Sequence, residues 1–209
     1  MAITFKTEGI ILKSKDYKEA DRLYTILTKN HGKLVVRAQG VKKINSKLAG
    51  HLEPITKTAL FIVGTKSFSK IGGATITQSY RHLKKDIKKI NSLNNCFAII
   101  DNLILEGQQD QDVYRLTENL LSWCDGHAIN SLIIFSFIFK LFNLLGVKPD
   151  YSKSSGDLAK VLHFLSVAPW EKIQKLRLSA DLWQQLTAIF NNFVKLHLSP
   201  NLQKRNFLL

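Results

Sequence analysis

Cysteine is scarce in this sequence, whose 209 residues include only Cys96 and Cys124. Small secreted domains that depend on disulfide bonds carry many more cysteines, so the sequence does not fit that class. Each cysteine lies in an apolar stretch of helical character, and we predict two buried, reduced thiols. The residues from Met1 to Lys6 do not combine a basic segment with an apolar run, as a secretory signal would. We therefore expect a cytoplasmic protein.

Long apolar runs are also missing. The most apolar segment, residues 132–145, is interrupted by Ser136, Lys140 and Asn143. It is shorter than the roughly 20 residues that a membrane-spanning helix needs. We expect this segment to be a core helix.

Acidic residues are few: 16 Asp and Glu stand against 30 Lys and Arg, which gives a formal net charge of +14. Such an excess favours a polyanionic partner, either nucleic acid or an anionic membrane surface. Residues 1–80 hold 14 basic and 5 acidic side chains and so carry most of the excess. The basic run 81–89 extends it but is too short for an amphipathic membrane-binding helix. Nucleic acid is therefore the favoured partner.

Catalytic motifs are absent as well. The sequence contains no His-Glu-x-x-His, no phosphate-binding glycine-rich loop and no nucleophile elbow, and its six histidines show no metal-ligand spacing. Asp110 and Asp112 could suggest the metal pair of a nuclease. Acidic residues at the start of a helix, where the helix dipole stabilises them, are the favoured interpretation. We expect a non-enzymatic protein without cofactor or metal.

The first eighty residues show the pattern of strands and turns. A tight turn is expected at 30–33, where Asn and Gly tolerate positive φ, and a bulge at Gly72-Gly73. Five short strands with a connector after the third favour an OB-like barrel, although an SH3-like barrel fits the same pattern. The expected strands are 3–12, 22–28, 34–38, 58–63 and 74–78.

After Tyr80 the apolar residues recur at helical spacing. Asp112 and Ser179 are predicted helix caps, and Gly146 followed by Pro149 is a predicted stop signal. The expected helices are 91–106, 112–124, 131–145, 157–167, a short one from Pro169, and 180–198. The predicted fold is therefore α+β and multidomain, with an OB-fold barrel over residues 1–80 and an all-α helical domain over residues 81–209.

A cluster of cations is expected around one turn and one connector of the barrel. Cations on adjacent loops can follow a phosphate backbone with little sequence preference. Aromatic side chains suited to base stacking are less evident, with Tyr17, Tyr24 and Phe68 as candidates. The predicted DNA-binding residues are Lys33, Arg37, Lys42, Lys43 and Lys47.

Four ordered fragments across about fifty residues resemble the opening of the bacterial RecO family of DNA repair proteins. They are Thr7-Glu8-Gly9-Ile10-Ile11-Leu12-Lys13 with Asp16-Tyr17-Lys18-Glu19-Ala20-Asp21-Arg22-Leu23, His31-Gly32-Lys33, Ala38-Gln39-Gly40-Val41-Lys42-Lys43, and Ser46-Lys47-Leu48-Ala49-Gly50-His51-Leu52-Glu53-Pro54. The helical half matches more loosely, at Phe139-Lys140-Leu141-Phe142-Asn143-Leu144-Leu145-Gly146-Val147-Lys148-Pro149 and at Lys204-Arg205-Asn206-Phe207-Leu208.

The resemblance implies a nucleoid-associated recombination mediator. Such proteins bind single- and double-stranded DNA, anneal complementary strands, engage the tail of single-stranded-DNA-binding protein, and act with RecR to help load RecA. A pocket for that acidic, apolar tail is expected in the helical domain, near Lys140 or near Lys204 and Arg205. An RNA-binding OB-fold protein of RNA processing is the alternative, because the charge fits it equally well.

One departure from the family concerns zinc. Many relatives carry a Cys-x-x-Cys-Gly motif after the Gly-x-x-Pro, as half of a four-cysteine site. This sequence has Ser152-Lys153-Ser154-Ser155-Gly156 there, and a serine hydroxyl does not replace a thiolate at structural zinc. We predict no zinc and a shortened insertion between the third and fourth helices.

Overall fold

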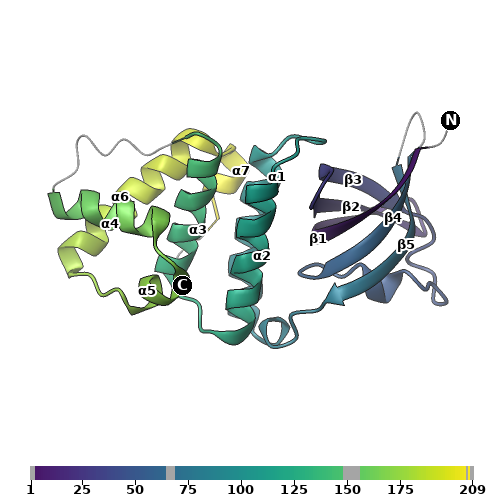
Figure 1. The fold of residues 1–209 in the computed structure, drawn as a ribbon, viewed down its shortest axis with the longest axis horizontal. Coiled ribbons are helices and arrows are strands. Elements are labelled where there is room, and N and C mark those ends of the chain that lie inside the picture. The colour runs from purple at the N-terminus through teal and green to yellow at the C-terminus, as the bar shows by residue number, and fades with distance from the viewer. Residues whose placement is uncertain (1–2, 65–68, 148–155, 206, 208–209) are drawn as a thin grey trace.

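Five strands close into a barrel at the N-terminal end of the chain (Figure 1). A computed structural model describes residues 3–64, 69–147, 156–205 and 207. The order around the barrel is β1-β2-β3-β5-β4, in which β3 and β5 are parallel neighbours, and this is the OB-type arrangement rather than the SH3-like alternative. The strands are β1 (Ile3–Tyr17), β2 (Asp21–Thr28), β3 (Gly32–Ala38), β4 (Lys57–Gly64) and β5 (Ser69–Gln78).

Strand β1 is longer than predicted, because its polar end continues the sheet. The first part of β1 pairs with β4, and the part from Gly9 to Tyr17 pairs with β2. A bulge lies at Leu12, since Ile11 is opposite Ile26 while Lys13 is opposite Thr25. The polar segment 13–16 was therefore wrongly predicted to end the strand.

The bulge predicted at Gly72-Gly73 is present in β5. Phe61 of β4 is opposite Gly73 and Ile62 is opposite Ile71, so Gly72 is the extra residue of a bulge in β5. Such a bulge bends the strand and helps the sheet to close.

The rest of the described chain is helical. A 3-10 turn, η1 (Ala49–His51), lies in the connector after β3, and a second one, η2 (Leu83–Lys85), links β5 to the helices. The helices are α1 (Ile87–Leu103), α2 (Gln111–Gly126), α3 (Ser131–Leu144), α4 (Gly156–Val167), α5 (Trp170–Lys175), α6 (Ala180–His197) and α7 (Pro200–Gln203).

Helix caps explain where several of these helices begin and end. Ser179 caps α6 as predicted, and Gly146 follows α3 with a φ of +76°, as expected of a helix-ending glycine. The predicted cap at Asp112 is wrong, because Asp110 accepts the N–H groups of Asp112 and Val113. Helix α1 begins earlier than predicted, because Asp86 caps it.

The barrel and the helices share a hydrophobic core. Helix α3 is buried nearly all round at the centre of the helical part, with Phe135, Phe139 and Phe142 among its buried side chains. Barrel side chains that face α1 and α2 join this cluster, namely Ile10, Leu12, Leu27 and Ile55. A second cluster, around Ile11, Ile26, Val36 and Ile62, fills the barrel interior.

Cys96 and Cys124 are buried and free, as predicted. The predicted zinc-free, shortened insertion falls on residues that lie outside the described part of the chain, apart from Gly156. In the described ranges, no helix is both long and apolar enough to span a membrane.

Candidate nucleic-acid interface

The connector between β3 and β4 presents three lysines to solvent: Lys42, Lys43 and Lys47, which we call the connector cluster. The connector is anchored from below by the buried side chains of Val41 and Leu52. The Lys42 N–H donates to the carbonyl of Ala20 at 2.9 Å, which fixes the connector to the turn between β1 and β2. The lysines therefore project from a loop with a defined path.

Asp16 and Asp21 accept hydrogen bonds from the cations and the backbone near the start of the connector. Asp16 accepts from Lys42 Nζ at 2.8 Å and from Arg22 Nε at 2.9 Å, and these hydrogen bonds keep its pKa below the usual range. Asp21, which is buried, accepts the Gly40 N–H at 2.6 Å and Arg37 Nε at 2.7 Å. The hydrogen bond from Gly40, with the one from Arg37, likewise lowers the Asp21 pKa despite its burial. Both carboxylates are therefore ionised at neutral pH and organise the cations around them.

Of the five predicted DNA-binding residues, the three lysines of the connector cluster are the most exposed. Lys43 and Lys47 are exposed and have no ion-pair partner among the described residues. Arg37 lies beneath them, half-buried against Asp21 and 5.6 Å from the centre of the Tyr17 ring. Its guanidinium supports the connector more than it faces solvent.

Lys33 lies apart from the other four. It is only 7 % exposed, and its ammonium donates to the Asp101 carbonyl at 2.5 Å and to Asp101 Oδ1 at 3.1 Å. Lys33 and the connector lie at opposite ends of β3, which at about 3.3 Å per residue puts roughly 16 Å between them. Lys33 therefore joins the barrel to α1. The prediction placed Lys33 on one DNA-contacting surface with the connector, and the structure corrects this by placing it at the contact between the barrel and α1.

The aromatic residues predicted as candidates for base stacking differ in exposure. Tyr24 is buried in the barrel interior, where it has no face free for a base. Tyr17 is half-buried beside Lys18 and Arg37. Phe68 lies outside the described residues. An exposed aromatic ring that sequence reasoning missed is Phe61 on β4, because its strand is apolar on both faces and alternation gave no orientation.

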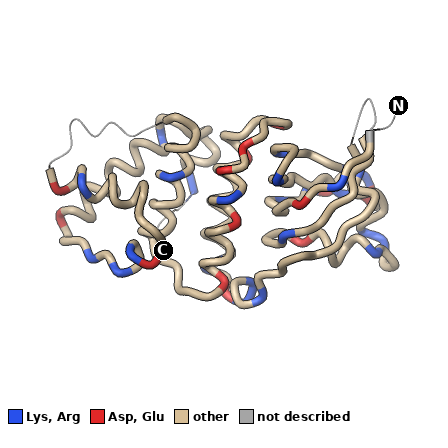
Figure 2. The backbone as a smooth tube through the Cα atoms, in the orientation of Figure 1, with Lys and Arg blue, Asp and Glu red and all other residues tan. Residues whose placement is uncertain are grey.

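The basic run after the barrel is partly used for internal contacts. Lys84 pairs with Glu53 of the connector at 2.7 Å, and Lys89 donates to the Cys124 carbonyl at 2.8 Å. Arg81, Lys85 and Lys88 remain exposed. Figure 2 marks basic positions along the backbone of the barrel and at this link, and several acidic positions along α2.

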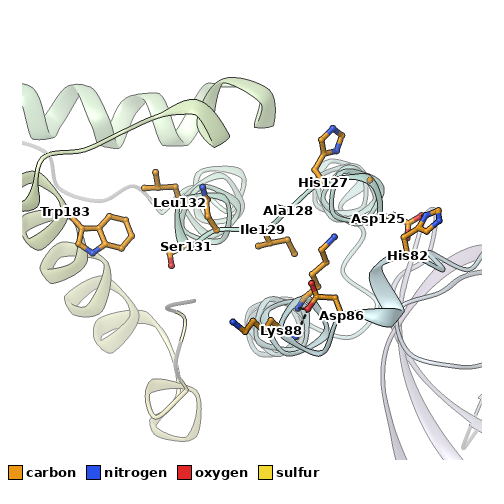
Figure 3. A pocket seen from close by; sticks show the side chains of 13 residues that line it. His82, Asp86, Lys88, Asp125, His127, Ala128, Ile129, Ser131, Leu132 and Trp183 are labelled. Carbon is orange, nitrogen blue, oxygen red and sulfur yellow. Dashed lines mark hydrogen bonds and ion pairs between the residues drawn. The ribbon is translucent and has the colours of Figure 1, made fainter.

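A pocket of about 980 Å³ lies beside this run (Figure 3). His82, Asp125 and His127 lie on one side and Trp183 on the other. His127 stacks on Trp123 with the ring centres 3.7 Å apart, and Asp125 accepts the Leu83 N–H at 2.8 Å. Across residues 3–64, 69–147, 156–205 and 207, no three His, Cys, Asp or Glu side chains gather as a metal site would require.

The two regions predicted to bind the acidic tail of single-stranded-DNA-binding protein lie at different places in the helical part. Lys140 donates to the Ala168 carbonyl at 2.5 Å and lies 3.9 Å from the centre of the Trp170 ring. Burial lowers the pKa of Lys140 to about 8, although Glu171 opposes the shift. Arg205 instead lies at a groove of about 800 Å³ between the barrel and α1, which we call the barrel–helix groove. Its lining includes Leu12, Lys13, Ile55, Lys84, Phe97 and Arg205.

The closed barrel, its basic connector and the attached helices define the class of OB-barrel proteins with an all-helical second part. Family models agree: the one described as "Recombination protein O N terminal" matches residues 1–80, and "Recombination protein O C terminal" matches residues 84–157. The chain belongs to the RecO family, a family of DNA repair and recombination proteins.

Individual relatives carry the same name. "DNA repair protein RecO" of Moorella thermoacetica is 32 % identical over 145 residues, which cover 69 % of this chain and 54 % of that protein, so the chain matches about half of its length. The proteins of that name from Caldanaerobacter subterraneus subsp. tengcongensis and Thermoanaerobacter sp. are 22 % and 23 % identical, with 97 % of this chain and 96 % of each relative covered.

Proposed function

We propose that this chain is a recombination mediator that binds single- and double-stranded DNA and anneals complementary strands without catalysing a reaction. The observation that carries this proposal is the connector cluster, which presents exposed lysines on an OB barrel in a chain of the RecO family. Lys42, Lys43 and Lys47 contact the phosphates in this proposal, and Arg37 holds the base of the connector. Lys33 keeps the barrel on α1.

Electrostatics supply both binding and annealing in this mechanism. Each lysine that neutralises a phosphate releases condensed counterions, so the affinity falls as salt rises and depends little on sequence. The same positive surface reduces the repulsion between two complementary strands. Base pairing then supplies the free energy of annealing, so neither ATP nor a metal ion is needed.

The partners in this proposal are RecR, the acidic tail of single-stranded-DNA-binding protein and, indirectly, RecA. Of the two regions considered for the tail, the barrel–helix groove fits better. Its floor is apolar at Leu12, Ile55 and Phe97. Its rim carries Arg205, which forms no ion pair with a described residue, together with Lys13 and Lys84, which pair with Asp101 and Glu53. The Lys140 ammonium, by contrast, is engaged by a carbonyl and a tryptophan ring. Arg205→Glu should therefore weaken binding of an acidic, apolar peptide, and Lys140→Met should not.

The experiment is annealing of two complementary oligonucleotides, one coated with single-stranded-DNA-binding protein, in EDTA and without ATP. We expect acceleration that fades with rising salt and is lost when Lys42, Lys43 and Lys47 are all changed to Glu. The matched control changes Lys172, Lys175 and Lys195 to Glu, three exposed lysines of the helical part, so that the net charge falls equally. Equal losses in both triple variants would contradict a role for the connector itself. Tighter binding to a matched RNA than to DNA would favour the RNA-processing alternative.

A further inference from the structure

Strand β4 exposes one large aromatic side chain on the outer wall of the barrel. Leu60 and Ile62 point into the barrel and are at most 3 % exposed, whereas Phe61 between them is 38 % exposed. The ring borders a surface hollow of about 550 Å³. Its lining includes Lys6, Lys29, Asn30, Phe61, Gly73 and Thr75. These residues come from β1, β4 and β5, which are neighbouring strands (Figure 1), and from the turn after β2, so the hollow lies on the wall of the sheet.

The bulge in β5 brings the glycine backbone against this ring. Gly73 is opposite Phe61 in the strand register, and the adjacent Gly72 is the extra residue of the bulge. A Cβ atom at Gly72 would lie 2.9 Å from Phe61 Cδ1, a distance at which something must shift. The two glycines therefore place no side chain beside the ring. The backbone of β5 therefore packs against one side of Phe61, and the 38 % of the side chain that is exposed is the part that a flat ligand can reach.

Positive charge surrounds the ring and is not neutralised. Lys6 is directly opposite Phe61 on β1, one strand spacing of about 4.8 Å away. Lys6 and Lys29 are exposed, and neither forms an ion pair with any residue that the structure describes. The acidic residue of the hollow, Glu8, is paired with Lys57 at 2.9 Å. The hollow thus combines an aromatic face, two free ammonium groups, and the polar side chains of Asn30 and Thr75.

This combination fits a nucleobase and its phosphates better than a protein surface. A protein-docking face is usually built around a cluster of large apolar side chains, and this hollow exposes only Phe61 among such residues. A base stacks on an aromatic ring whatever its identity, while lysines neutralise the neighbouring phosphates. Because the stacked face must be free, the ligand is a single strand.

We propose that Phe61 is a base-stacking residue of a second single-strand site on the barrel, with Lys6 and Lys29 as its phosphate contacts. The inference rests on the proposed function and deepens it. Lys6 and Asp16, the latter bound to Lys42 of the connector cluster, are ten residues apart on β1, roughly 30 Å along an extended strand. The two sites therefore lie near opposite ends of β1, and one barrel can hold two strands, or two segments of one strand, at once.

The test measures affinity for a short single-stranded oligonucleotide and for the same strand with abasic positions. We expect Phe61→Ala and Phe61→Leu to weaken binding to the normal strand by about 5- to 30-fold, and Phe61→Tyr to bind as the wild type does. On the abasic strand, where no base can stack, Phe61→Ala should bind as the wild type does. Leu144→Ala, at another exposed apolar residue on α3, is the matched control and should leave both affinities unchanged.

The outcomes separate this inference from the proposed function. If the Lys42, Lys43 and Lys47 triple variant loses binding while Phe61→Ala keeps full affinity, the stacking site is wrong and the proposed function stands. Equal losses on normal and abasic strands would also overturn stacking, because they would show a general effect on the barrel. A change of molecular mass in sedimentation for Phe61→Ala, with unchanged DNA affinity, would make the hollow a contact between copies and overturn the inference. If the wild type binds no DNA, the proposed function itself fails.

Discussion

At the scale of single residues, carboxylate partners decide which lysines of the barrel are available to a ligand. Asp101 on α1 accepts from both Lys13 and Lys33, whereas Lys43 and Lys47 have no acidic partner in the part of the chain that the structure describes. The sequence contains all four lysines within a basic segment and gives no sign of this division. Asp101 is 68 positions from Lys33, so the pairing depends on the docking of α1 against the barrel. Charge could be predicted from composition, but accessibility could not.

Asp101→Asn should destabilise the protein at neutral pH by about 2 kcal/mol, because Lys33 would lose the charge that balances its buried ammonium. Burial raises the pKa of Asp101, but the hydrogen bonds from Lys13 and Lys33 outweigh it and hold the pKa below its usual range. A carboxyl whose pKa is lower in the folded state stabilises above about pH 4, and this contribution is lost as the pH falls through the folded-state pKa. Urea denaturation of both proteins between pH 7 and pH 3 should show a difference that shrinks below pH 4.

The control for this prediction is Asp157→Asn. Asp157 pairs with Lys160, and both side chains are exposed, so the loss should be small. An Asp101→Asn variant as stable as the wild type at pH 7 would show that the Lys33 contact contributes nothing.

At the scale of elements, the residue pattern located the five strands and the five longer helices correctly, but several boundaries were wrong. Periodicity reports which residues face a core, and the first turn of a helix on a surface need not face one. Lys88 and Lys89 were interpreted as part of a charge run, yet they form the first turn of α1, where the Asp86 side chain accepts both of their N–H groups. A helix cap depends on a hydrogen bond between one side chain and the backbone. Where two acidic residues lie close together in the sequence, composition cannot show which of them makes this bond.

The pair Asp110 and Asp112 tests this point directly. Asp110→Ala should destabilise the protein by about 1 kcal/mol, because two N–H groups at the start of α2 lose their acceptor. Asp112→Ala should change stability much less, since Asp112 makes only an exposed contact of 3.5 Å with Arg115. Thermal and urea denaturation of the two variants measure the difference. A larger loss for Asp112→Ala would return the cap to the position predicted from sequence.

At the scale of the whole molecule, the barrel and the helices are joined by apolar and ionic contacts. Lys57 of β4 binds Glu8 on β1 at 2.9 Å and Glu118 on α2 at 2.7 Å. The Gly107 N–H donates to the Lys33 carbonyl at 2.8 Å. The change of pattern near residue 81 indicated two structural parts, and the sequence could not reveal how closely they are packed. Leu12 and Leu27 lie in strands and pack against the helices. In the sequence they look the same as strand residues that face the barrel interior, because both kinds are apolar.

The shared core predicts that the two parts unfold together. All three tryptophans, Trp123, Trp170 and Trp183, belong to the helical part, so tryptophan fluorescence reports on the helices alone. Leu12→Ala removes a side chain that is 2 % exposed and packed in the core shared with the helices. The resulting cavity should cost about 2–4 kcal/mol and lower the fluorescence midpoint in urea.

Ile26→Ala makes the sharper test, because Ile26 is fully buried in the barrel's own cluster. In a cooperative transition, a cavity deep in the barrel lowers the midpoint of every probe, including one that sees only helices. We therefore expect the tryptophan midpoint and the hydrogen-exchange protection of the β2 amides to fall together in Ile26→Ala. A variant that loses strand protection while its tryptophan midpoint stays at the wild-type value would show two independently folding parts. The contacts of Lys33 and Lys57 would then serve to orient a separate barrel rather than to stabilise it.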